Sequence, residues 1–142
     1  MNQTIVIPKT FQTNVRIKFR DADPAGIMFF GNILGLSHDI FEEFLAENQV
    51  TWDEWFKSSD LACPIRHTEV DYMFPFEPGK SYEVTVKVNK VSQSSFTMIY
   101  EYRNDLSRIC SRVQMIHTFV DQKTFQKADI PEKYRNIFER YL

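Results

Sequence analysis

The stretch from Val15 to Leu45, VRIKFRDADPAGIMFFGNILGLSHDIFEEFL, changes its hydrophobic period partway along. Apolar and charged residues alternate from Val15 to Phe19, which is typical of a half-buried β-strand. Residues 21–26, DADPAG, have the composition of a turn. Beyond Asn32 the apolar residues recur every three or four positions, which predicts a helix of about four turns that ends near Asn48.

The rest of the chain contains a short helical segment, a run of strand-like segments and a final helix. Thr51 precedes an acidic first turn and is a typical N-cap, so we expect a short helix up to about Ser59. Pro131 at a first helical position predicts a C-terminal helix. Between them, period-two alternation predicts four strands, at residues 64–74, 82–88, 96–102 and 109–119.

A strand, a long helix and then a run of strands is the order of an α+β fold, with the helix packed on one face of an antiparallel sheet. The connections Glu77–Lys80 and Asn104–Ser107 are short, so the strands that they join are expected to be antiparallel neighbours. Gly35 lies inside the long helix, where glycine costs about 1 kcal/mol relative to alanine, and we expect it to permit close packing against the sheet. With no repeat or linker, residues 1–142 are expected to form a single domain.

Charge and composition argue against several classes of protein. The 142 residues carry a formal net charge of -2, which gives no long-range attraction for nucleic acid. Residues 1–14 contain only a short apolar run, so we expect neither a signal peptide nor a membrane span, and a cytoplasmic location. Cys63 and Cys110 lack metal or disulfide spacing and are interpreted as small apolar fillers. We therefore expect no metal, and the absence of nucleotide and redox motifs predicts no cofactor.

The turn before the helix contains the strongest candidate for a catalytic group, Asp23. Pro24 restricts Asp23 toward extended backbone conformations, and Gly26 allows a positive φ. The first amides of a helix have no intrahelical partners, so they could polarise a carbonyl while Asp23 attacks it or activates a water. The same residues also fit an ordinary turn, and Asp21 is an alternative carboxylate with the same strand parity.

Residues 16–32, RIKFRDADPAGIMFFGN, resemble the opening of 4-hydroxybenzoyl-CoA thioesterase-type hotdog proteins. The resemblance implies a five-stranded antiparallel sheet wrapped around a long central helix. It also implies dimers joined edge to edge, often paired into tetramers, with the active site between subunits. Asp23 would be the catalytic carboxylate, and the amide of Phe30, beside Gly31, would polarise the thioester carbonyl.

Residues 37–45 and 64–68 further resemble the 1,4-dihydroxy-2-naphthoyl-CoA thioesterases, which implies an aromatic acyl group. His67 lies in the second of these stretches. His67 could contact the substrate or form a hydrogen bond between subunits.

The other two histidines have local explanations. His38 precedes Glu42 by one helical turn, so a polar pair is expected. His117 shares a strand face with Val113 and Met115, so we expect a core histidine with its hydrogen bonds satisfied.

The sequence does not clearly identify the basic residues that would bind the phosphates of CoA. Some relatives place a basic cluster before the serine-phenylalanine pair, whereas this chain has only Lys90 near that position. Arg103, Arg108 and Arg112 are alternatives, because guanidinium groups suit phosphate oxygens, although each also fits a solvated surface position.

Together these features predict an acyl-CoA thioesterase in which Asp23 is nucleophile or general base. The alternative is a module that binds acyl-CoA or acyl-carrier protein without hydrolysis, because a fold can be retained after its catalytic activity is lost. A hotdog dehydratase would need a histidine-carboxylate motif, and none of the three histidines lies in one.

Overall fold

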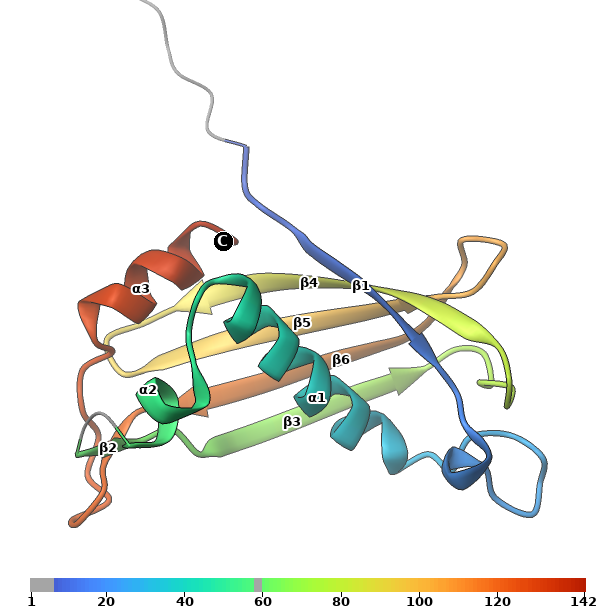
Figure 1. The fold of residues 1–142 in the computed structure, drawn as a ribbon, viewed down its shortest axis with the longest axis horizontal. Helices are drawn as coiled ribbons and strands as arrows, with labels where there is room; N and C mark the ends of the chain where they lie inside the picture. Colours follow the sequence, from blue (N-terminus) through green and yellow to red (C-terminus); the bar gives the residue numbers. More distant parts are fainter. Residues whose placement is uncertain (1–6, 58–59) are drawn as a thin grey trace, which may run out of the picture.

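The computed structural model describes residues 7–57 and 60–142. Its helices are η1 (Phe19–Asp21), α1 (Asn32–Glu47), α2 (Trp52–Lys57) and α3 (Glu132–Glu139). Its strands are β1 (Phe11–Arg16), β2 (Leu61–Ala62), β3 (Ile65–Tyr72), β4 (Ser81–Val91), β5 (Ser95–Arg103), β6 (Ile109–Thr118) and β7 (Val120–Asp121). Figure 1 shows α1 crossing one face of the large sheet, with α2 near one end of that sheet and α3 beside β4.

The five long strands form one antiparallel sheet in the order β1-β4-β5-β6-β3, which confirms the α+β class. The connection Asn104–Ser107 joins the neighbours β5 and β6, as predicted. The prediction for Glu77–Lys80 is wrong, because β3 pairs with β6 while β4 pairs with β1 and β5. β3 is therefore an edge strand.

The segment between β3 and β4 crosses the end of the sheet instead of forming a hairpin. Other parts of the chain supply its backbone partners: Met28 N–H donates to the carbonyl of Phe76 (2.8 Å), and Gly79 N–H donates to that of Ile17 (2.7 Å). These bonds attach the crossing segment to the stretch that contains Asp23.

β1 ends at Arg16, earlier than the predicted Val15–Phe19 strand. Asp21 causes the difference, because its Oδ2 accepts a hydrogen bond from the Lys18 amide (2.9 Å) and helps to fold the next residues into η1. Phe19, which the alternation places on the buried face, is consequently 95% exposed.

α1 spans 16 residues, as predicted, and its buried residues form one stripe against the sheet. Phe44 is fully buried within that stripe. Its ring lies 6.0 Å from that of Phe11 on β1, 6.3 Å from that of Phe138 on α3 and 4.8 Å from that of Tyr141. One aromatic cluster therefore joins the two ends of the chain to the central helix.

The two shorter helices agree with prediction where the structure describes them. Thr51 Oγ1 accepts a hydrogen bond from Glu54 N–H (3.2 Å), as expected of an N-cap for α2. The predicted end near Ser59 lies outside the described residues. Pro131 immediately precedes α3. Within residues 7–57 and 60–142, no helix combines the length and apolar character needed to cross a bilayer.

Gly35 does not pack against the sheet, contrary to prediction. It lies on the exposed side of α1, and a Cβ at this position would meet no atom within 4 Å. The buried stripe instead includes Ile33 and Ser37, and a residue two positions along a helix from Ile33 points to nearly the opposite side.

Candidate active site

Asp23 lies in the turn between η1 and α1, where the backbone holds it firmly. Its N–H donates to the carbonyl of Ile27 (2.9 Å), and Gly26 N–H donates to the carbonyl of Asp23 (3.0 Å). Its Oδ1 accepts a hydrogen bond from Ala25 N–H (2.8 Å). Gly26 has φ of 79°, a conformation that favours glycine. The carboxylate is half-buried, and Oδ2 accepts no hydrogen bond from the described residues.

Asp21 has a structural role. Besides the contact of its carboxylate with the Lys18 amide, its carbonyl accepts hydrogen bonds from Phe29 N–H (2.8 Å) and from Asn32 Nδ2 (2.8 Å). These contacts tie the turn to the start of α1. Asp23 is therefore the more available of the two carboxylates.

The start of α1 offers backbone donors. The amide of Asn32 donates to the carbonyl of Phe29 (3.0 Å). In the part of the chain that the structure describes, the amides of Phe30 and Gly31 have no acceptor. Unpaired amides at the positive end of a helix dipole stabilise negative charge on a bound oxygen.

Tyr72 at the end of β3 holds this segment from the other side, because its hydroxyl donates a hydrogen bond to the carbonyl of Phe30. The contact fixes the peptide that follows Phe30, whose N–H belongs to Gly31. Analysis of the sequence missed Tyr72, since the contact spans 42 residues and leaves no local pattern.

His67 is not part of this cluster within one chain. It lies on β3, and its Nε2 is 2.8 Å from Glu69 Oε1. Five residues separate it from Tyr72, or about 17 Å along a strand. The structure therefore brings Phe30 and Gly31 together near the turn of Asp23, with His67 toward the other end of β3.

A second feature, which sequence analysis did not predict, is a cavity of about 240 Å³ between the later half of α1, α2 and β6. Apolar and aromatic side chains form most of it, including Phe41, Trp55 and Phe56. Cys63 also lines it, and burial raises the pKa of its thiol, consistent with an apolar filler. Its residues come from distant segments, so no local spacing indicates it.

His117 on β6 lines this cavity. The prediction that it is a core histidine with its hydrogen bonds satisfied is wrong in part. It is 1% exposed, but its Nε2 has no hydrogen-bond partner among the described residues. The ring stacks on Phe96, with centroids 4.8 Å apart, and lies 4.7 Å from the ring of Phe41. A buried polar atom without a partner costs about 1–3 kcal/mol, and the surrounding aromatic packing must offset this cost.

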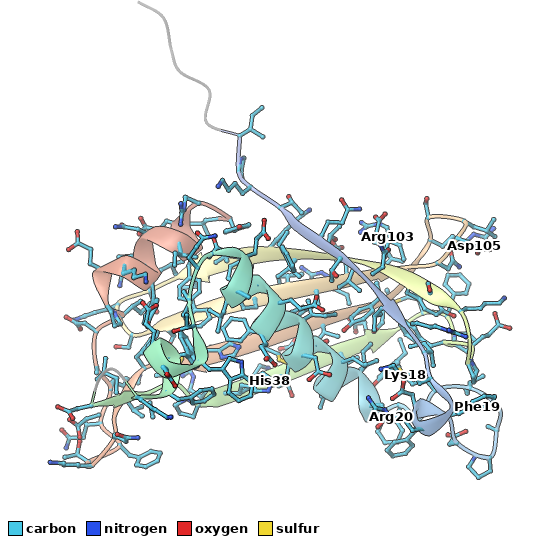
Figure 2. The ribbon with its side chains drawn as sticks, viewed as in Figure 1. Lys18, Phe19, Arg20, His38, Arg103 and Asp105 are labelled. Atoms are coloured by element: carbon cyan, nitrogen blue, oxygen red, sulfur yellow. The ribbon has the colours of Figure 1, made fainter. Side chains whose placement is uncertain are left out.

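His38 is also at the cavity, and its predicted pairing with Glu42 is wrong. Glu42 Oε1 instead accepts a hydrogen bond from Trp52 Nε1 (2.7 Å), because α2 folds back against α1. The His38 ring lies 6.5 Å from that of His117. Figure 2 shows His38 on α1, on the side toward β3.

The protonation of His117 predicts how stability depends on pH. Burial, with a smaller contribution from His38, lowers the pKa of His117 from its ordinary 6.5 to about 3. Between these values the unfolded chain binds a proton at this residue and the folded chain does not, so the free energy of unfolding falls as pH falls. At pH 5 we expect a loss of about 2 kcal/mol from this group.

The measurement is urea unfolding of the wild type and of His117→Phe at pH 7.5 and pH 5. The wild type should lose about 2 kcal/mol more than the variant between these two conditions. Equal losses in both proteins would contradict a depressed pKa for His117.

The cations considered for CoA phosphates differ in their contacts. Arg103 donates to Thr85 Oγ1 (3.0 Å), and the Arg108 guanidinium lies 5.8 Å from the centre of a phenylalanine ring. Lys90 and Arg112 are exposed on the sheet. Figure 2 shows two further basic residues, Lys18 and Arg20, which lie close to each other near Phe19 and which the sequence pattern did not single out. That any of these residues binds the CoA phosphates stays a prediction.

Known proteins share both the sequence pattern and the fold. The family model described as the thioesterase-like superfamily matches residues 17–138. A 1,4-dihydroxy-2-naphthoyl-CoA hydrolase from Nostoc punctiforme is 26% identical over 124 residues, which are 87% of this chain and 83% of that protein. A 1,4-dihydroxy-2-naphthoyl-CoA thioesterase from Synechocystis superposes with a TM-score of 0.86 at 22% identity, covering 92% of this chain and 96% of that one. A Staphylococcus aureus protein solved in complex with CoA superposes with a TM-score of 0.87 at 13% identity, covering 98% and 87%.

These similarities confirm the predicted hotdog fold, in which the five-stranded antiparallel sheet lies against α1. The match begins at Ile17, just ahead of the turn that contains Asp23, and it ends within α3. Since the family model covers most of the chain, this protein belongs to the thioesterase-like superfamily.

Proposed function

We propose that this protein hydrolyses an acyl-CoA thioester to the free acid and CoA, with Asp23 as nucleophile or general base. The observation that carries the proposal is a half-buried carboxylate in the turn that leads to the unpaired amides of Phe30 and Gly31. An aromatic acyl group is the preferred substrate, and 1,4-dihydroxy-2-naphthoyl-CoA is the candidate, because the relatives from Nostoc punctiforme and Synechocystis bear that name.

The proposed reaction places the thioester oxygen at the amides of Phe30 and Gly31. Negative charge develops on this oxygen when the carbonyl carbon is attacked, and the two donors stabilise it. Asp23 either attacks the carbon itself or removes a proton from an attacking water. The carbon–sulfur bond then breaks, CoA leaves as the thiol, and one water is consumed overall. Tyr72 acts as a positioning residue through the carbonyl of Phe30.

We propose that the protein acts as an oligomer built on β3. This strand is a sheet edge and is exposed along nearly its whole length, and exposed edges are templates for pairing. Large apolar side chains are exposed along it and on the Asp23 turn: Ile27, Phe29, Phe30, Ile65, Tyr72, Met73 and Phe74. Ile27, Phe30, Tyr72, Met73 and Phe74 line one shallow hollow, and an exposed apolar surface of this kind supports a protein interface.

Antiparallel pairing of two β3 edges would place the end of one strand beside the start of the other. The Asp23 turn of one copy would then approach the partner's His67. In this arrangement His67 could contact the substrate or form a hydrogen bond with the other subunit. Within one chain it lies too far from the Asp23 turn for either role. Assembly into tetramers and a cytoplasmic location stay predictions.

A thiol-release assay tests the function. As the test substrate we take 1-hydroxy-2-naphthoyl-CoA, which differs from the candidate substrate only by lacking the 4-hydroxyl group. We expect its kcat/KM to be at least about tenfold above that of straight-chain acyl-CoA substrates, because a site suited to a flat ring makes contacts that a straight chain cannot make. Benzoyl-CoA should lie between them.

Absence of thiol release from every substrate would contradict the proposal. If acyl-CoA then still raised the melting temperature of the protein, the non-hydrolytic binding module would be favoured instead.

A further inference from the structure

A groove of about 430 Å³ lies between η1 and the segment that precedes β4. Its lining includes Ile17, which is fully buried, together with Phe19, Pro78 and Gly79. Ile17 N–H donates to the carbonyl of Lys80 (3.0 Å), and Gly79 N–H donates to that of Ile17 (2.7 Å). Two backbone hydrogen bonds therefore hold its two sides together. Sites for small ligands have volumes of about 300–1,000 Å³, so this groove is large enough for one.

Phe19 presents an aromatic ring to solvent at this groove. It is 95% exposed, the largest fraction among the large hydrophobic residues that the structure describes. The short helix η1 and the hydrogen bond from the Lys18 amide to Asp21 hold Phe19 out of the core, although the strand pattern would bury it. An exposed ring on a fixed backbone is a surface on which a planar base can stack.

The groove also carries positive charge. Arg16 and Lys18 line it and are exposed, and in the part of the chain that the structure describes neither side chain forms an ion pair. Among the described residues that line the groove, none is acidic. Figure 2 shows Lys18 close to Arg20 and Phe19. Unpaired cations beside a stacking ring suit a nucleotide, because its phosphates are negative and its base is flat.

Carboxylates determine on which side of these cations an anion is favoured. Arg16 and Lys18 also border a smaller groove on the side of α1, and that groove contains Asp21, Asp39 and Glu43. Three negative side chains repel phosphate there. The side of the cations that faces Pro78 is therefore the better place for phosphate groups.

We propose that the groove beside Phe19 is a nucleotide-binding site, in which Phe19 stacks on the base while Arg16 and Lys18 bind the phosphates. The identity of the nucleotide rests on the proposed function: it is the phosphorylated adenosine of CoA. Phe19 precedes Asp23 by four residues, which span at most about 14 Å. CoA carries its nucleotide and its thioester at opposite ends of one flexible arm, so a single molecule extends from the groove to the carboxylate.

Lys90, the other position considered for the CoA phosphates, lies near the opposite end of β4. It is nine residues beyond Ser81, the first residue of that strand, or about 30 Å along it. The groove lies at Pro78 and Gly79, just before the start of β4. Variants at the two positions therefore distinguish the two locations.

Direct binding of adenosine 3′,5′-bisphosphate tests the site without any turnover. Isothermal titration calorimetry should detect binding to the wild type. Adenosine, which lacks the phosphates, should bind at least about tenfold more weakly, because it forms no bond with the two cations.

Three variants should weaken binding of adenosine 3′,5′-bisphosphate. Arg16→Gln and Lys18→Gln should each weaken it by at least about fivefold, and Phe19→Ala by about tenfold through loss of stacking. Each side chain is exposed, so the variants should fold. Lys127→Gln is the matched control, because it removes an exposed charge between β7 and α3 and should change binding less than about twofold.

Hydrolysis adds a readout that a general structural change would not give. Arg16→Gln and Lys18→Gln should lower kcat/KM for 1-hydroxy-2-naphthoyl-CoA by at least about fivefold. The corresponding pantetheine thioester lacks the nucleotide, so these two variants and the wild type should hydrolyse it with kcat/KM values within about twofold of one another.

The inference is overturned if the wild type does not bind adenosine 3′,5′-bisphosphate, if Arg16→Gln and Lys18→Gln bind it like the wild type, or if Lys90→Gln weakens binding in their place. A lower molar mass of Phe19→Ala in light scattering would assign the ring to a subunit interface and would also overturn it. Binding without hydrolysis of any acyl-CoA would refute the proposed function alone, and hydrolysis without binding at these residues would refute the nucleotide site alone.

Discussion

Replacing Asp23 with asparagine is expected to lower kcat/KM for 1-hydroxy-2-naphthoyl-CoA by about 100- to 10,000-fold. Asparagine keeps an oxygen that can accept the hydrogen bond from Ala25 N–H, so the turn should survive. It removes the negative charge and with it the capacity to attack a carbonyl or to take a proton from water. The loss should appear in the rate of thiol release, with an unchanged melting temperature.

Asp21→Asn is the matched control, because it removes the same charge two residues away. Its amide oxygen can still accept from the Lys18 amide, and Asp21 makes its other contacts through the backbone. We expect kcat/KM to change by less than about threefold. Wild-type activity in Asp23→Asn, or an equal loss in Asp21→Asn, would remove Asp23 from the proposed mechanism.

Mixing two inactive variants should restore activity, which is the second large effect. Asp23→Asn lacks the carboxylate and His67→Ala lacks the side chain proposed to contact the substrate from the partner, so each protein alone should have little activity. In a mixed dimer, one of the two sites combines an intact Asp23 from one chain with an intact His67 from the other. Equal amounts refolded together should recover about one quarter of wild-type activity, since half of the dimers are mixed.

Each variant refolded alone provides the control, together with wild type taken through the same procedure. A site contained within one chain predicts no recovery, because neither chain of a mixed dimer has both features. Failure of the mixture to regain activity, with mixed dimers demonstrated by two affinity tags, would exclude the shared site.

The helices were predictable from the sequence because their signals are local. α1 follows from apolar spacing over consecutive turns, and Thr51 caps α2 within three residues. Strand order was not predictable in the same way. The segment before β4 looks like a short hairpin connection, but its partners are Met28 and Ile17, which are far away in the chain.

The errors at the level of single residues have a common origin. Phe19 continues the alternation of the preceding strand, yet a side-chain contact from Asp21 ends that strand. Glu42 is spaced to meet His38, yet Trp52 of the next helix takes its carboxylate. In both cases one specific hydrogen bond overrides what the periodic pattern predicts.

Periodicity, capping residues and turn composition establish an α+β chain with one long helix, and residues 16–32 point to Asp23 through their resemblance to thioesterases. These features depend on residues within a few positions of one another, so they can be recognised from the sequence alone. The unpaired amides beside Tyr72, the exposed edge of β3 and the cavity around His117 exist only after folding. They arise where separate elements meet, as Tyr72 and Phe30 do across 42 residues, and such contacts depend on the packing of whole elements, which leaves no local pattern.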